Sequence, residues 1–413
     1  MKSNYKRLGN YIRIVDVRNK AEKRENLLGL SVAKVFIKSI ANTVGTDFST
    51  YRVVKRNQFT YIPDTSRRGD KIAVALQSEF EEGLVSQAYT VFEVTDHNAL
   101  LPEYLMMWFR RPEFDRYARF MSHGSVRELF EWEDMCNVAL PIPPVNKQRE
   151  IVNEYNVIQS RIALNQRIIQ RLNETAQCLY KQWFVDFEFP NEQGKPYKST
   201  GGEMFFHPQL EMQIPKGWDV RPLSDFCDVK GGKRLPKDEE LNDLGDGNPY
   251  IRVADMNRSK YTVLNGKFQY VENAVQKLIS RYVVSEDDVI ISIVGTIGLV
   301  SVIHKSLDGA NLTENCMKLT NFNGINSDFL YHFLVSAEGQ RIIETKTVGG
   351  VQGKLPLYNI QSIPILYSNN KILLAFSKLL FAINDDLVNR ITQNAKLSEV
   401  RDLLLSKLAS IES

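Results

Sequence analysis

The chain has 413 residues, more than one hydrophobic core usually fills, so its length predicts two or more domains. Hydrophobic residues make up 43% and charged residues 24%, values that argue against bulk disorder. The 52 Lys and Arg nearly balance the 49 Asp and Glu, for a net charge of +3. This balance neither indicates nor excludes a nucleic-acid binder, because a DNA reader needs local basic surface rather than a basic total.

No segment indicates secretion or a membrane span. Residues 1–8 lack the apolar core of a signal peptide, and the longest apolar runs, such as 289–294, have the length of a strand. The cysteines form no CxxC pair and no metal-ligand spacing with histidine, so no metal site is expected. Free thiols in a reducing cytoplasm are expected for Cys136, Cys178, Cys227 and Cys316.

Residues 1–144 predict a mixed α+β domain, with strand-like alternation at 51–54 and 89–94 and a helix at 101–109. Prolines at 141–144 then break the chain, as prolines commonly do at the start of a helix. The segment 145–189 follows as a long helix. Its apolar residues recur alternately every four and three positions, which is typical of a coiled-coil seam. The seam residues are Ile158, Ile162, Asn165, Ile169, Leu172, Leu179 and Trp183.

The same order recurs in the second half of the chain. A polar linker is expected at 190–214, a second α+β domain at 215–368 and a second long helix at 369–413. The seam of this helix is apolar at both ends and polar in the middle, and its apolar members are Ile383, Leu387, Leu397, Leu404 and Leu408. We expect the two helices, each roughly 55–60 Å long at about 1.5 Å per residue, to pack antiparallel. The alternative is that they are ordinary core helices of the two domains.

A shift of about 225 positions aligns the two halves without gaps over some sixty residues. Gly124 then aligns with Gly349, and the seam residues Ile162 and Leu172 align with Leu387 and Leu397. The sequence therefore predicts an internal repeat with pseudo-two-fold symmetry.

Glycine-rich and basic loops occur in both predicted domains. Arg and Lys contact phosphates and guanine, Gln pairs with adenine edges, and Gly lets the backbone approach a duplex. Any one such loop is more often ordinary solvated surface, but Gly-x-Val precedes both Arg127 and Gln352 at equivalent points of the repeat. The candidate DNA contacts are Arg67, Arg68, Lys71, Ser125, Arg127, Lys230, Lys233, Arg234, Arg258, Lys260, Gln352 and Lys354.

Signatures of an enzyme are missing from the sequence. It contains no GxxxxGK[ST] phosphate loop and no GxGxxG after a strand. The tripeptide at 248–250 lacks the second proline of an adenine methyltransferase motif, and the acidic run at 236–240 lacks the acid-x-Lys strand of a nuclease. No catalytic residue and no bound cofactor are therefore expected.

Several segments resemble the signatures of the specificity subunits of type I restriction–modification enzymes, in the order and spacing of that family. They are Leu140-Pro141-Ile142-Pro143-Pro144 with Gln148-Arg149-Glu150, Leu179-Tyr180-Lys181-Gln182-Trp183-Phe184, Ile214-Pro215-Lys216-Gly217-Trp218, Val284-Ser285-Glu286-Asp287-Asp288 with Gly295-Thr296-Ile297-Gly298, and Leu403-Leu404-Leu405-Ser406-Lys407-Leu408. The end of the second domain departs from the pattern, because 363–368 lacks the double proline and the Gln-Arg-Glu. This departure leaves the start of the second helix open.

The resemblance implies a division of labour. Each domain would be a target recognition domain that reads one half of a split, asymmetric double-stranded DNA site, and the helices would set the spacer and dock two modification subunits. S-adenosylmethionine would be bound by those subunits, and ATP with Mg²⁺ by restriction subunits. Two alternatives remain: a coiled-coil scaffold that does not contact DNA, and a divergent DNA methyltransferase or nuclease.

Overall fold

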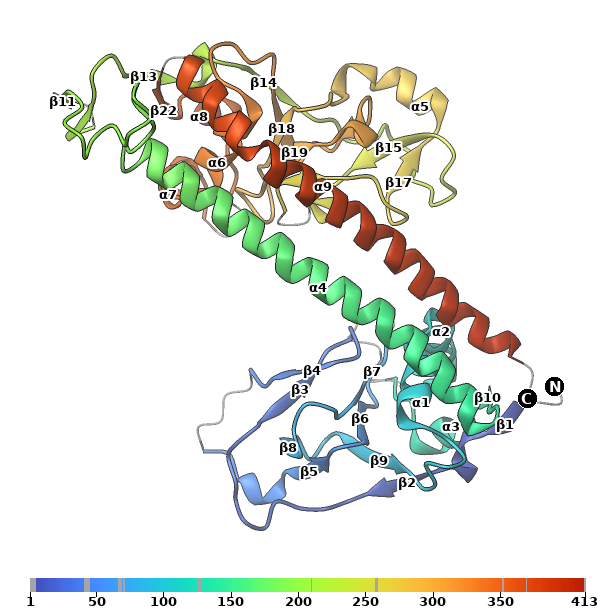
Figure 1. Cartoon of the computed structure of the whole chain (residues 1–413). Helices are drawn as coiled ribbons and strands as arrows, with labels where there is room; N and C mark the ends of the chain where they lie inside the picture. Colours follow the sequence, from blue (N-terminus) through green and yellow to red (C-terminus); the bar gives the residue numbers. More distant parts are fainter. Residues whose placement is uncertain are drawn as a thin grey trace. The chain divides into compact units, whose positions relative to one another are not determined.

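The computed structural model describes residues 5–40, 45–65, 69, 71–124, 128–208, 210–256, 259–350, 353–368 and 370–411 (Figure 1). The chain divides into two compact units, unit 1 (Met1–Arg161 with Ser398–Ser413) and unit 2 (Ile162–Leu397). The division cuts both long helices, so each unit contains a part of α4 (Val145–Phe184) and a part of α9 (Asn370–Lys407).

Unit 1 is built on an antiparallel four-stranded sheet in the order β2-β9-β6-β7. Every residue of β6 is buried, and the rings of Phe59 and Phe92 stack across β6 and β9 with centroids 4.9 Å apart. Helix α1 begins with Pro102 and packs its apolar residues on these rings, with Phe109 edge-on to Phe59. The elements are β1 (Tyr5–Arg7), β2 (Ile12–Val15), β3 (Leu28–Leu30), β4 (Phe36–Lys38), β5 (Arg52–Lys55), β6 (Gln58–Ile62), β7 (Ala73–Leu76), β8 (Glu82–Val85), β9 (Thr90–Val94), α1 (Pro102–Phe109), α2 (Pro112–Met121), α3 (Trp132–Asn137) and β10 (Ala139–Pro141).

Unit 2 has a five-stranded mixed sheet in the order β14-β21-β18-β19-β16, and a separate three-stranded sheet, β17-β15-β20. Strands β18 and β19 are buried along their whole length, which explains why their sequences are almost continuously apolar. The elements are β11 (Met204–His207), β12 (Met212–Pro215), β13 (Asp219–Pro222), β14 (Asp228–Gly231), β15 (Asn248–Ile251), β16 (Tyr261–Thr262), β17 (Gln269–Val271), α5 (Asn273–Leu278), β18 (Val289–Ser292), β19 (Val300–Ile303), β20 (Asn311–Leu312), β21 (Cys316–Thr320), α6 (Ser327–Val335), α7 (Ala337–Lys346), α8 (Leu357–Gln361) and β22 (Pro364–Tyr367).

The order of elements repeats between the two units. Elements α1, α2, α3, β10 and α4 begin at residues 102, 112, 132, 139 and 145, and α6, α7, α8, β22 and α9 begin 225 residues later, at 327, 337, 357, 364 and 370. The sheet order β2-β9-β6-β7 likewise corresponds to β14-β21-β18-β19. This recurrence supports the internal repeat that the sequence predicts.

Within unit 2, α4 and α9 lie side by side and run antiparallel (Figure 1). Asn165 lies beside Asn394 near one end of the contact, and Trp183 packs against Phe376 near the other. Within unit 1, the last turns of α9 join the core beside the first turns of α4 through Leu405 and Leu408. The predicted seam residues Ile162, Asn165, Trp183, Leu387 and Leu408 are buried, and Ile158, Ile169, Leu172, Leu179, Ile383, Leu397 and Leu404 are partly buried.

The segment 190–214, for which the polar composition predicts a linker, has folded structure of its own. It contains β11 and most of its antiparallel partner β12, and Tyr197 stacks on Phe189 with centroids 4.6 Å apart. Phe189 in turn stacks on Trp218 at 5.3 Å. These aromatic contacts attach the segment to the core of unit 2, a long-range effect that local composition does not reveal.

Candidate nucleic-acid interface

In unit 2, one edge of the five-stranded sheet gathers several predicted contact loops. Strands β14 and β18 both pair antiparallel with the intervening β21, so they are parallel and their carboxyl ends lie at one edge. Backbone hydrogen bonds hold the following loops there: Gly232 N–H donates to the Cys316 carbonyl at 3.0 Å, and Ile293 N–H to the Asn315 carbonyl at 2.8 Å.

A hairpin is fixed at the same edge. Val348 and Lys354 exchange two backbone hydrogen bonds, of 2.9 and 2.8 Å, which close the loop between them. Leu355 N–H then donates to the Ile293 carbonyl at 3.0 Å, tying the hairpin to the segment after β18. The loops at 232–234, 293–299 and 348–354 therefore converge on one edge.

Three cationic side chains of the predicted set are exposed at this edge: Lys233, Arg234 and Lys354. Arg234 hydrogen-bonds to Glu314 through its Nε at 2.8 Å, and Lys233 lies 5.7 Å from the centroid of the Tyr282 ring. Burial alone would raise the pKa of Glu314, but the hydrogen bond from Arg234 holds it below its usual value. Arg234 is thus oriented by a carboxylate while its guanidinium stays accessible.

Gly232 is required by the close approach of two backbone segments. A Cβ atom at this position would lie 2.0 Å from the Thr313 carbonyl oxygen and 2.5 Å from that of Leu312. Any larger residue would push the 232–234 loop away from the sheet edge.

Unit 1 repeats the arrangement. Strands β2 and β6 flank β9 and end at one edge, and the hairpin closed by His123 and Leu129 is tied to the segment after β6 by a hydrogen bond from Phe130 N–H to the Pro63 carbonyl, 2.9 Å long. The described ends of these two loops, 123–124 with 128–129 and 348–350 with 353–354, are therefore tethered in the same way in both units.

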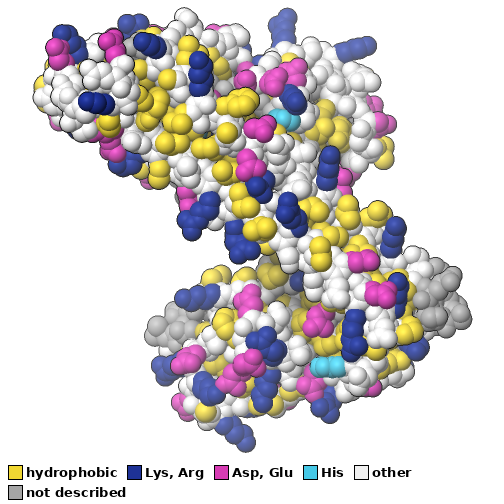
Figure 2. All heavy atoms as spheres, in the orientation of Figure 1, with side chains coloured by type: hydrophobic (Ala, Val, Ile, Leu, Met, Phe, Trp, Pro, Cys, Tyr) yellow, Lys and Arg dark blue, Asp and Glu magenta, His cyan; other side chains and the backbone are white. Residues whose placement is uncertain are grey.

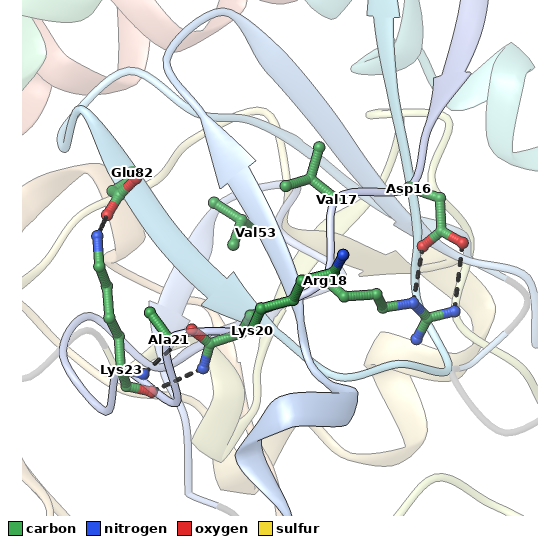
Figure 3. A pocket seen from close by; sticks show the side chains of 9 residues that line it. Asp16, Val17, Arg18, Lys20, Ala21, Lys23, Val53 and Glu82 are labelled. Carbon is green, nitrogen blue, oxygen red and sulfur yellow. Dashed lines mark hydrogen bonds and ion pairs between the residues drawn. The ribbon is translucent and has the colours of Figure 1, made fainter.

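Sequence reasoning missed the charged segment after β2. The side chain of Asn19, 2% exposed, donates to the Lys23 carbonyl at 2.8 Å and to the Phe48 carbonyl at 3.1 Å, which fixes the loop. Asp16 pairs with Arg18, and Lys23 with Glu82, around a surface hollow of about 540 Å³ (Figure 3). The signal in the sequence was the run of charged residues at 20–25, interrupted only by Ala21, which begins five residues after the last residue of β2.

Several predicted contacts lie outside the residues that the structure describes: Arg67, Arg68, Ser125, Arg127, Arg258 and Gln352. Lys71 is exposed in unit 1. Lys230 is also exposed, but it lies on β14 and pairs with Asp228 at 2.8 Å rather than standing at the strand's end.

The structure contradicts the prediction that Lys260 contacts DNA. Its side chain is 1% exposed and forms an ion pair with Asp328, and its Nζ donates to Asn384 Oδ1 at 2.8 Å. A lysine buried in this way is unavailable to DNA, so its role is to join the segment before β16 to α6 and α9. The prediction failed because both partners lie far away in sequence.

The face drawn in Figure 2 carries dark-blue and magenta side chains interspersed over both units, in agreement with the net charge of +3. Within the described part of the chain, no cluster of three or more His, Cys, Asp or Glu residues could hold a metal ion. Among the helices described, none has the length and apolar character needed to cross a membrane.

The sequence of the chain is similar to those of known proteins. Residues 215–394 match the type I restriction modification DNA specificity domain. The chain is 22% identical to the type I restriction enzyme HindI specificity subunit of Haemophilus influenzae, over 90% of both chains. It is also 25% identical to the type I restriction enzyme MjaIX specificity subunit of Methanocaldococcus jannaschii, over 75% of this chain and 69% of that one.

The fold resembles that of a solved protein. The S subunit of a type I restriction–modification system from M. genitalium superposes with a TM-score of 0.53 at 15% identity, over 99% of this chain and 96% of that one. This likeness confirms the predicted fold class of mixed α+β domains with long helices.

Proposed function

Because the chain belongs to the specificity subunits of type I restriction–modification systems, we propose that it reads a bipartite, asymmetric DNA target, one part with each unit. The observation that carries the proposal is the sheet edge of unit 2. Its strands and the exposed Lys233, Arg234 and Lys354 all lie within 215–394, the matched specificity domain. Unit 1 presents an edge of the same construction.

The charged side chains at this edge have the chemistry that binding to DNA requires. Lys233 and Lys354 can neutralise phosphates, and Arg234 can exchange Glu314 for a phosphate or for the O6 and N7 acceptors of guanine. Gly232 keeps the loop that carries Lys233 and Arg234 close to the sheet edge. The loops have few cations, so base reading would depend on their shape as well as on charge.

In this proposal the chain itself does no chemistry. Two modification subunits would bring S-adenosylmethionine and methylate adenine, and restriction subunits would bring ATP and Mg²⁺. Helices α4 and α9 would hold the subunits and set the spacer of the target.

The function is tested by co-expressing the chain with its cognate modification subunit and sequencing the methylated adenines of the host DNA. We expect one bipartite motif with a fixed spacer, and its disappearance when the chain is left out. Unchanged methylation without the chain, together with no complex between the two proteins, would contradict the proposal and favour the scaffold.

Reversing charge at the unit 2 edge is expected to weaken DNA binding. The triple variant Lys233→Glu, Arg234→Glu, Lys354→Glu should lower the affinity of the assembled complex for its target by roughly tenfold to a thousandfold and flatten the salt dependence, because phosphate contacts release counterions. Affinity is measured by competition binding at several salt concentrations.

The matched control reverses three exposed lysines of unit 2 that lie elsewhere: Lys198→Glu, Lys277→Glu and Lys305→Glu. It changes the net charge by the same amount and should leave affinity within a few-fold of the wild type. Equal losses in both variants would assign the effect to overall charge and remove the edge from the interface.

Asn165, Trp183 and Leu387 of the predicted seam are buried, so docking of partner subunits would fall to other positions. On α9, Leu374 and Phe381 are seven residues apart, share one face and are 60% and 73% exposed. We expect Phe381→Glu to weaken the complex with the modification subunit by about tenfold or more, measured by the concentration needed for co-elution. Lys396→Glu, exposed on the same helix, is the control, and equal weakening by both would exclude this face.

A further inference from the structure

A polar layer around the fully buried Asn165 interrupts the helix pair of unit 2. Asn165 is 0% exposed, and its amide donates to Gln393 Oε1 at 2.7 Å and to Asn394 Oδ1 at 2.9 Å. Its carbonyl accepts a hydrogen bond from Arg390 Nη1 at 3.2 Å. All of these partners lie on α9, and Ile162 and Leu387 beside them are buried and apolar.

Asn165 and Arg390 are equivalent positions of the internal repeat. Helices α4 and α9 begin 225 residues apart, and so do these two residues. In an antiparallel pair of repeated helices, equivalent residues meet only at the centre of the pairing. The layer therefore lies where Asn165 contacts its own repeat equivalent, Arg390.

At this centre the two helices are not interchangeable. The positions of α4 that correspond to Gln393 and Asn394 are Ile168 and Ile169. If α4 paired with the α4 of a second copy in the same register, Asn165 would face Asn165 of that copy, and Ile168 and Ile169 would stand in place of its two acceptors, Gln393 and Asn394. Asn165 would then keep at most one of its three side-chain partners. If α9 paired with another α9, Arg390 would face Arg390, and two like charges would meet.

We propose that this layer selects α9, and rejects a second copy of α4, as the partner of α4. The device works by leaving polar groups unpaired in the wrong pairing, as buried asparagines do in helix pairs generally. It rests on the proposed function in one respect: pairing unlike halves keeps two different recognition domains together, and so preserves an asymmetric target.

The test uses the full-length chain in two differently tagged copies that are co-expressed. The apolar-layer variant Asn165→Ile, Arg390→Leu, Asn394→Ile removes the penalty from every pairing. We expect the fraction of mixed complexes, measured by native mass spectrometry after tag capture, to rise by roughly five- to a hundredfold over wild type. The control places three apolar residues at exposed positions, Gln166→Ile, Asn389→Leu and Lys396→Ile, and should mix no more than wild type.

A folded apolar-layer variant that mixes as little as wild type would overturn the proposal, and so would a control that mixes equally. A second variant, Arg390→Asn, Gln393→Ile, Asn394→Ile, reproduces the α4 layer on α9 and should lower the urea concentration at half-unfolding. An unchanged midpoint would show that Asn165 does not depend on α9, and would also overturn the proposal. Mixing is measured without DNA, so its outcome is separate from that of the adenine-methylation experiment.

Discussion

Replacing Lys260 by alanine is expected to lower the free energy of unfolding of unit 2 by about 3–5 kcal/mol, because it leaves a buried carboxylate without its counter-ion. Burial lowers the pKa of Lys260, although Asp328 opposes this shift. Burial would likewise raise the pKa of Asp328, but the charge and hydrogen bond of Lys260 hold it below its usual value. Asp328 therefore opposes the loss of the Lys260 charge, and Lys260 favours the ionised form of the Asp328 carboxyl group.

The measurement is urea unfolding of Lys260→Ala beside Lys277→Ala, an exposed lysine of the same unit that should change stability by less than about 0.5 kcal/mol. The double variant Lys260→Met, Asp328→Leu removes both charges and should recover most of the loss. If Lys260→Ala were as stable as wild type but lost DNA affinity, the lysine would be a DNA contact after all.

Lys260 also illustrates what the sequence could not provide. Arg258-Ser259-Lys260 reads as a basic loop, and only the fold brings it to Asp328, 68 residues later, and to Asn384, 124 residues later. Unit 1 buries Lys34 in a comparable way, 4% exposed and 2.8 Å from Asp115. Basic residues in this chain therefore divide into interior ion pairs and surface cations, and sequence alone does not separate the two groups.

Features that depend on periodicity were predictable. The four-and-three spacing indicated two long helices, and the structure has α4 and α9 there, ending five and six residues before the predicted bounds 189 and 413. The 225-residue shift recurs in the order of the elements. By contrast, the convergence of the 232–234 and 348–354 loops depends on sheet order, which has no local signature.

The partners of buried polar groups were also not predictable from the sequence. Asn165 was visible as an interruption of the seam, but its partners were not, because Gln393, Asn394 and Arg390 are ordinary surface residues by composition. Their function comes from the register of two helices that are far apart in the chain.

A second buried group is expected to make the stability of unit 2 depend on pH. His332 on α6 is 1% exposed; its ring stacks on Tyr180 with centroids 6.3 Å apart, and its Nδ1 lies 3.1 Å from Gln177 Oε1. Burial, assisted by the positive charge of Lys260, lowers the pKa of His332 to about 3. The folded protein therefore keeps this ring neutral at pH values where an unfolded chain protonates it.

The direction of this pH dependence follows from whether the folded or the unfolded state binds a proton at His332. Above the unfolded pKa of about 6.5 neither state is protonated at His332, and stability does not depend on this group. As the pH falls below that value, the unfolded state gains a proton that the folded state excludes, so stability declines by about 1.4 kcal/mol per pH unit until the folded pKa near 3 is reached. At pH 4.5 the loss from this residue should be roughly 2–3 kcal/mol.

The variant His332→Phe keeps the aromatic packing and cannot be protonated, so its denaturation midpoint should fall less than that of wild type between pH 7.5 and 4.5. His97→Phe, at an exposed position of unit 1, should follow the wild-type profile. Parallel profiles for His332→Phe and wild type would mean that the ring is protonated equally in both states. That result would be incompatible with a histidine enclosed among α4, α6 and α9. A flatter profile for His332→Phe alone would tie the acid sensitivity of unit 2 to the contact between its recognition domain and its helices.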